Sequence, residues 1–114
     1  MKKQYNLPLI SVITPTLNSE QDLPKLIESI KRQEYPSSKI EVIISDGGSK
    51  DSTVKIAKQN HAKIINNKYV FAEPGVYLGM QKAKGELLMV LAPDNIYEDK
   101  YAFKKIANIF SNSE

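Results

Sequence analysis

The chain has 114 residues, which suits a single domain, and its hydrophobic content of 41% is enough to fill one core. Sixteen Lys and Arg against 13 Asp and Glu give a mild net charge of +3, so a nucleic-acid partner is not expected. The absence of cysteine excludes disulfides and zinc–thiolate sites, and the longest apolar run, residues 87–92, is too short to span a bilayer. We therefore expect one cytoplasmic domain over residues 1–114, with at most a weak attraction to the anionic inner face of a membrane.

Strand and helix patterns alternate along the chain. Apolar runs predict strands over residues 9–14, 40–44, 62–65 and 86–91. Apolar side chains at helical spacing predict helices around Leu23, Leu26, Ile27 and Ile30, then Val54 and Ala57, then Val76, Gly79, Met80 and Ala83, and finally Phe103, Ile106, Ala107 and Phe110. We expect Asp22 to cap the first helix, Ser49 or Asp51 to cap the second, and Gly85 to end the third.

This alternation predicts an α/β fold with a parallel sheet and helices on both faces. Right-handed crossovers favour the strand order third, second, first, fourth. Ligands bind beyond the carboxyl ends of such strands, so we expect Thr14, Asp46 and Asp94 at one edge. Residues 66–68 follow the third strand to the same edge, where they either border the ligand or are ordinary polar loop residues.

The most specific short motif follows the second strand. It reads Ser45-Asp46-Gly47-Gly48-Ser49. Two glycines allow a sharp turn and a close approach of the backbone to a ligand, with Asp46 accepting hydrogen bonds from a base or ribose. The same residues also suit a plain strand-to-helix turn in which Asp46 caps the helix. The motif alone leaves both interpretations open.

Three stretches together resemble the family 2 glycosyltransferases. The first, residues 13–20, reads Ile-Thr-Pro-Thr-Leu-Asn-Ser-Glu and is similar to the strand and turn that open this family. The second, residues 26–33, is similar to its first helix, and the third, residues 45–53, to its Val-Asp-(Asp/Gly)-Gly-Ser-x-Asp-x-Thr signature. The resemblance extends over roughly residues 9–101. Residues 73–82 are similar to a segment of some bacterial members, in a shortened form.

A fourth stretch is similar to the metal motif of that family. It reads Ala92-Pro93-Asp94-Asn95, with Ala92 at the first acidic or amide position. The resemblance implies that Asp94 and Asn95 offer oxygen ligands to a divalent cation, Mg²⁺ or Mn²⁺, which also binds substrate phosphates. The alternative is that Asp94 is simply a turn residue after Pro93.

The resemblance implies the nucleotide-binding part of a Rossmann-like GT-A domain, a three-layer sandwich. Its reaction would move a sugar from a nucleoside-diphosphate sugar, with a UDP-sugar favoured, to a hydroxyl acceptor such as a glycan or a lipid-linked sugar, with inversion. The residues carried over to nucleotide binding are Thr14, Pro15, Thr16, Asn18, Asp46, Gly47, Gly48 and Asp94. The catalytic base of the family lies well beyond its metal motif, so no residue here matches it and no catalytic residue is named.

We therefore expect a fragment or a truncated form of this domain. The alternative function is a catalytically inactive nucleotide-binding or interaction module, a remnant in which Ala92 reports lost metal chemistry. In either case, apolar surface that would meet the acceptor half is expected to be exposed, which favours a homo-oligomer.

Overall fold

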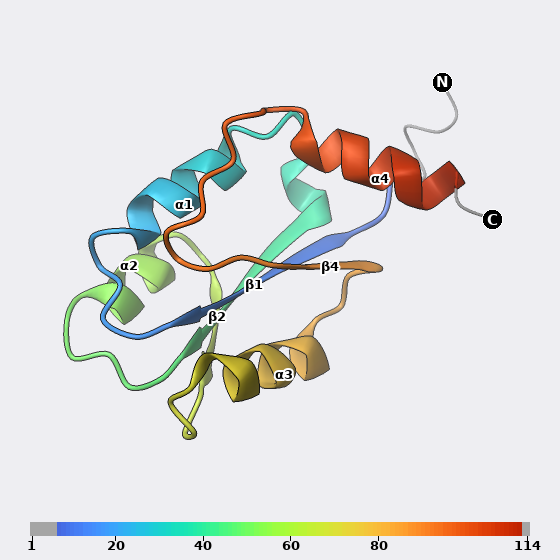
Figure 1. Ribbon diagram of the computed structural model, residues 1–114. Helices are drawn as coiled ribbons and strands as arrows, with labels where there is room; N and C mark the ends of the chain where they lie inside the picture. Colours follow the sequence, from blue (N-terminus) through green and yellow to red (C-terminus); the bar gives the residue numbers. More distant parts are fainter. Residues whose placement is uncertain (1–6, 113–114) are drawn as a thin grey trace.

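The computed structural model describes residues 7–112 and contains one four-stranded sheet (Figure 1). The strands are β1 (Ile10–Thr16), β2 (Ile40–Asp46), β3 (Lys63–Asn66) and β4 (Leu87–Val90). They lie in the order β3-β2-β1-β4, and each neighbouring pair is parallel. The predicted strand order and direction are confirmed.

Helices cover both faces of the sheet, which makes a three-layer α/β sandwich (Figure 1). One face carries α1 (Leu23–Lys31), α2 (Thr53–Gln59) and α4 (Ala102–Asn112), and the other carries α3 (Ala72–Lys82). A short 3₁₀ turn, η2 (Ser37–Lys39), leads into β2. Among the described residues, no helix is both long and apolar enough to cross a membrane.

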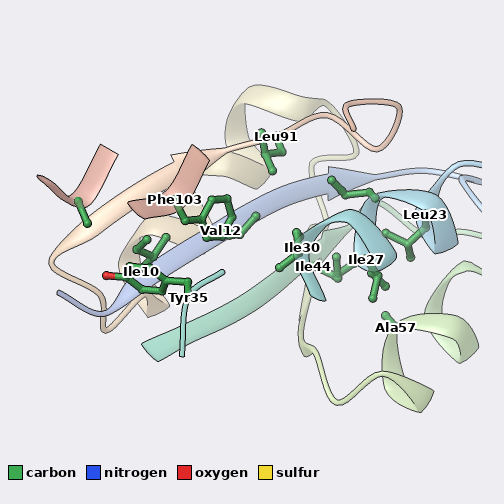
Figure 2. Close-up of a cluster of buried hydrophobic side chains, with 12 residues drawn as sticks. Ile10, Val12, Leu23, Ile27, Ile30, Tyr35, Ile44, Ala57, Leu91 and Phe103 are labelled. Atoms are coloured by element: carbon green, nitrogen blue, oxygen red, sulfur yellow. The ribbon is translucent and has the colours of Figure 1, made fainter. Parts of the chain in front are cut away.

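The main core lies between the sheet and α1, α2 and α4 (Figure 2). Alternate residues of β1 and β2 point into it, because successive side chains of a strand face opposite sides of the sheet. Its buried members are Ile10, Val12, Leu23, Leu26, Ile27, Ile30, Tyr35, Ile44, Ala57, Leu91, Phe103 and Ala107. The ring of Phe103 meets Tyr35 and Tyr97 edge-on, at centroid distances of 6.3 and 5.4 Å.

The opposite face is closed by a near-contact between α3 and β1. A Cβ added to Gly79 would lie 2.5 Å from Cγ2 of Ile13, which is fully buried. Only a residue without a side chain lets the helix lie this close to the strand. The glycine at this helical position therefore sets the distance between α3 and the sheet.

Of the expected helix ends, Asp22 stands at the N-cap of α1 as predicted, whereas the N-cap of α2 is Ser52 rather than Ser49 or Asp51, and Gly85 is not the C-cap of α3. Asp22 precedes α1 but has helical backbone angles and makes no capping hydrogen bond through its side chain; the turn is closed instead by the Leu23 N–H donating to the Ser19 carbonyl at 2.9 Å. Gly85 does not end α3, whose C-cap is Ala83. A Cβ on Gly85 would lie 2.5 Å from Ser11 Oγ, so this glycine allows a close passage beside β1.

Candidate functional site

The carboxyl ends of β1, β2 and β3 meet in register at one edge of the sheet. Thr16 pairs with Asp46, and Asp46 pairs in turn with Asn66. The first strand runs two residues further than the sequence predicted, so Thr16 rather than Thr14 lies at the rim. Thr14, two residues before Thr16 in β1, pairs with Ile44 and is fully buried. Pro15, between them, is half-buried.

Asp46 organises this edge through its side chain, which is only 5% exposed. Its Oδ1 accepts hydrogen bonds from the hydroxyls of Thr16, at 2.7 Å, and Ser49. Its Oδ2 accepts the backbone N–H groups of Gly48, at 3.0 Å, and Ser49, at 2.7 Å. Gly48 has a φ of +102°, a conformation that favours glycine, and this bends the chain around the carboxylate.

The ionised form of Asp46 is favoured. Burial raises the pKa of this carboxyl, but the hydrogen bonds from Ser49, Thr16 and Gly48 outweigh burial and lower the pKa below its ordinary value. Four donors also fill about four acceptor positions, which is the capacity of a carboxylate. Asp46 is therefore both a fixed negative charge and the structural centre of the loop that follows β2.

The loops after β1 and β2 are joined by a set of cross-loop hydrogen bonds, which we call the loop clamp. It consists of Asn18 N to Ser49 Oγ at 2.8 Å, Lys50 N to Asn18 Oδ1 at 2.8 Å, Ser19 N to Thr53 Oγ1 at 2.7 Å, Glu20 N to Asp51 Oδ2 at 3.2 Å, and Ser52 N to Glu20 Oε1 at 2.9 Å. Donors and acceptors come from both loops, so neither can move without breaking bonds to the other.

Two members of the loop clamp, Glu20 and Asp51, were not predicted to join the two loops. Glu20 accepts a backbone N–H of the second loop, and Asp51 accepts one from the first. Asp51 also accepts the N–H of Thr53, the first residue of α2, at 2.9 Å, whereas the Ser49 hydroxyl donates to Asp46. The sequence signal that could have revealed this role is that Glu20 and Asp51 lie within the two motifs, residues 13–20 and 45–53.

A tight turn follows β3 and lies against the loop after β2. Asn67 is 1% exposed; its Nδ2 donates to the Phe71 carbonyl at 2.8 Å, and its Oδ1 accepts the Tyr69 N–H at 3.1 Å. A Cβ added to Gly47 would lie 2.8 Å from the carbonyl oxygen of Val70. Gly47 is thus required by close packing of two loops, a role that its place in the motif did not reveal.

Two buried hydroxyls at this end of the sheet are unpaired among the described residues. They are Oγ1 of Thr14 and Oγ of Ser45, one from each central strand. Thr14 lies on the α1 side of the sheet and Ser45 on the α3 side, because their strand positions differ by one in the pairing register. They therefore do not form one site.

Asp94 and Asn95 lie in an exposed turn after β4. The turn is closed by the Asn95 N–H donating to the Ala92 carbonyl at 3.0 Å and by the Ala92 N–H donating to Asn95 Oδ1 at 2.8 Å. Over residues 7–112, no group of three His, Cys, Asp or Glu side chains is placed to hold a metal ion. These residues alone do not fit a complete metal centre, because they offer one free carboxylate and one amide oxygen that already accepts a hydrogen bond.

Comparison with known proteins gives consistent matches. The profile of Glycosyl transferase family 2 matches residues 11–114. Glycosyltransferase AglE of Haloferax volcanii is 33% identical over 94 residues, covering 77% of this chain and 31% of AglE. The crystal structure of S. aureus TarS 1–349 in complex with UDP superposes with a TM-score of 0.79 at 25% identity, covering 90% of this chain and 32% of that one.

A further structure shows the same fold at lower identity. It is the mannosyltransferase PcManGT from Pyrobaculum calidifontis in complex with GDP-Man and Mn²⁺, with a TM-score of 0.76 at 21% identity, covering 90% of this chain and 31% of that one. The chain thus spans about a third of the length of the proteins that it matches.

Proposed function

Because the chain belongs to glycosyl transferase family 2 and has the GT-A fold, we propose that it forms the donor-nucleotide part of an enzyme that transfers a sugar from a nucleoside-diphosphate sugar to a hydroxyl acceptor. The observation that carries this proposal is the edge where β1 and β2 end. There the ionised Asp46 and the loop clamp hold two backbone turns in fixed positions. Such a preorganised edge suits a polar ligand beyond the carboxyl ends of parallel strands.

The proposed nucleotide contacts come from both clamped loops. Of the residues carried over from the resemblance, Pro15, Thr16 and Asn18 border the ligand at the end of β1 and in the loop that follows it, whereas Thr14 is fully buried two residues earlier and does not reach the ligand. Asp46, Gly47 and Gly48 border it from the second, and Asp94 lies beyond β4. Because the Asp46 carboxylate is filled by protein donors, an N–H of the base or a ribose hydroxyl replaces one of them, and the rotatable Ser49 hydroxyl is the donor that yields most readily.

A divalent cation, Mg²⁺ or Mn²⁺, is proposed to enter together with the nucleotide. Asp94, with Asn95, would supply protein oxygens, and diphosphate oxygens would complete a coordination shell that the chain does not complete by itself. When bound, the cation offsets negative charge on the leaving diphosphate. The GDP-Man and Mn²⁺ complex of the structural neighbour supports this part of the proposal.

The rest of the proposed reaction rests on family membership. We propose inversion at the anomeric carbon, a UDP-sugar donor, supported by the UDP complex of TarS, and a glycan or lipid-linked sugar as acceptor. We assign no catalytic base to this chain. A cytoplasmic location at the inner face of a membrane belongs to the same proposal, supported by the small excess of positive charge.

The test is calorimetric titration of the chain with UDP, CDP, GDP and ADP, with and without Mn²⁺. We expect saturable binding with UDP strongest. Asp46→Ala should weaken UDP binding by about 1–3 kcal/mol, the usual cost of removing one partner of a buried charge-assisted hydrogen bond. Circular dichroism and thermal unfolding would establish that the variant is folded, and an unchanged dissociation constant would refute the role of Asp46.

A catalytically inactive interaction module is the second candidate, favoured by Ala92 and by the single free carboxylate at the metal motif. It predicts that no nucleoside diphosphate binds, with or without Mn²⁺. The same calorimetric panel therefore separates the two candidates.

A further inference from the structure

The turn after β3 exposes three consecutive large apolar side chains. Tyr69 is 53% exposed, Val70 46% and Phe71 74%. Isolated exposed apolar residues are ordinary, but three in a row at the tip of one turn make a patch, and such patches mark contact sites. We call residues 69–71 the apolar turn.

The apolar turn is held in a strained conformation. Val70 has a φ of +71°, in the left-handed region that a β-branched residue rarely adopts. Strain of this kind persists only where the surroundings enforce it, and it concentrates at ligand-binding positions. Burial of the Val70 side chain does not offset this strain, because the residue stays half-exposed.

The surroundings that enforce the strain belong to the candidate site. The side-chain amide of Asn67 hydrogen-bonds to both ends of the turn, at Tyr69 and Phe71. The backbone N–H of Asn67 donates to the carbonyl of Asp46 at 2.8 Å. The carbonyl of Val70 lies against Gly47, which has no room for a Cβ. The apolar turn thus lies against Gly47 through the Val70 carbonyl, and Asn67 links it to Asp46, the last residue of β2.

We infer that the apolar turn is a stacking platform for the base of the nucleoside diphosphate, with Tyr69 and Phe71 presenting their ring faces. This inference rests on the proposed function and names the residues that hold the base. A nucleobase has a flat π face, which suits an exposed ring, and an edge with N–H groups, which suits the ionised Asp46 carboxylate nearby. Lys68 Nζ lies over one face of the Tyr69 ring, 5.4 Å from its centre, so a base stacks on the other face.

A fluorescence reporter tests the platform directly, because the chain contains no tryptophan. Phe71→Trp introduces the single indole at the proposed contact, and Phe110→Trp introduces one on α4 as the matched control. UDP should quench the fluorescence of the first variant along a saturation curve, at the concentration where calorimetry reports binding, and should leave the second unchanged. Pyrophosphate, which lacks a base, should quench neither.

Alanine variants then measure how much the platform contributes. Tyr69→Ala and Phe71→Ala should each weaken UDP binding about 5-fold to 100-fold, the usual range for one stacked base, while Phe110→Ala leaves it unchanged. Pyrophosphate binding should not change in any variant. All three side chains are exposed, so thermal midpoints should stay close to that of the unmodified chain.

The outcomes separate this inference from the proposed function. If the unmodified chain binds UDP but Tyr69→Ala and Phe71→Ala bind it within twofold, and the Phe71→Trp reporter is silent, the platform is refuted and the proposed function stands. If the unmodified chain binds no nucleoside diphosphate, both are refuted.

Discussion

Asp46 carries a negative charge in a place where burial alone would oppose it. Four hydrogen bonds from Thr16, Gly48 and Ser49 stabilise that charge and lower the pKa of the carboxyl. The same bonds tie the turn after β2 to the end of β1. The sequence allowed either a ligand contact or a structural turn, and the structure shows the hydrogen bonds of the structural turn.

The lowered pKa of Asp46 predicts a pH-dependent stability. A group with a lower pKa when folded contributes stability that is fully present above its unfolded pKa, about 3.9, and is lost as the pH falls through the folded value. Asp46→Asn removes this ionisation, whereas all other groups titrate in both proteins. The difference in unfolding free energy between the two proteins, from urea titrations between pH 3 and 6, should therefore shrink toward the acid end. A difference that stays constant over this range would contradict the assignment.

Asp94 should couple metal to nucleotide. A cation held by one carboxylate keeps most of its waters and binds weakly, whereas diphosphate oxygens supply the missing ligands. Mn²⁺ and UDP should therefore strengthen each other by the same factor, and Asp94→Ala should abolish that coupling while metal-free UDP binding is kept. The measurement is UDP titration at several Mn²⁺ concentrations.

The matched control for Asp94→Ala is Asp99→Ala. Asp99 lies just before α4, and its carboxylate forms an ion pair with Lys105 at 2.8 Å. It should leave the coupling intact. Tight Mn²⁺ binding without nucleotide, or coupling that survives in Asp94→Ala, would show that the metal binds elsewhere.

At the scale of elements, the position of α3 depends on Gly79. An added Cβ would lie 2.5 Å from Ile13, a fully buried residue with no space to yield. Overpacking of this kind costs about 1–3 kcal/mol, and the better helix propensity of alanine returns about 1 kcal/mol. Gly79→Ala should therefore lower the unfolding free energy by up to about 2 kcal/mol in urea titration, even though alanine is the better helix former.

Lys82→Ala in the same helix is the control for Gly79→Ala, because this side chain is exposed. It should change the stability little. A Gly79→Ala protein about 1 kcal/mol more stable than the unmodified chain would show that α3 can shift away from the sheet at no cost.

At the scale of the whole molecule, β4 is an edge strand of the sheet that residues 7–112 form. The N–H groups of Leu87 and Leu91 donate to the carbonyls of Leu9, just before β1, and Ile13 within it, so those of Leu88 and Val90 point to the open side. These two residues are 41% and 51% exposed, on the sheet face that carries α3. Unpaired backbone groups next to apolar side chains are the usual site of strand pairing between chains.

We therefore expect concentration-dependent self-association through β4, measurable by analytical ultracentrifugation. Leu88→Lys combined with Val90→Lys should shift the equilibrium to monomer, because charged side chains discourage edge pairing. Ile109→Lys, at an exposed apolar position on α4, is the control and should leave the equilibrium unchanged. A chain that sediments as a monomer at all concentrations would contradict the expectation.

Much of the fold was accessible from sequence pattern. Apolar runs and helical spacing report local periodicity, and alternation of strands and helices restricts the connections to a few, so the order β3-β2-β1-β4 followed. Helix ends were less accessible: Asp22 stands at the N-cap of α1 but makes no side-chain capping bond, and Gly85 has a residue type that suits a cap but lies beyond the end of α3. Their roles depend on neighbours that are distant in the sequence, such as Ser11 beside Gly85.

The candidate site divides in the same way. The sequence by itself determined which loops reach the carboxyl edge and that Asp46 lies at its centre, because both follow from where the strands end. Only the tertiary structure decided how the loops are joined. The register that places Thr16 against Asp46 brings Asn18 to Ser49, 31 positions apart, and the packing of Val70 on Gly47 strains the apolar turn. Such contacts arise between side chains and backbone of separate segments, which no local periodicity records.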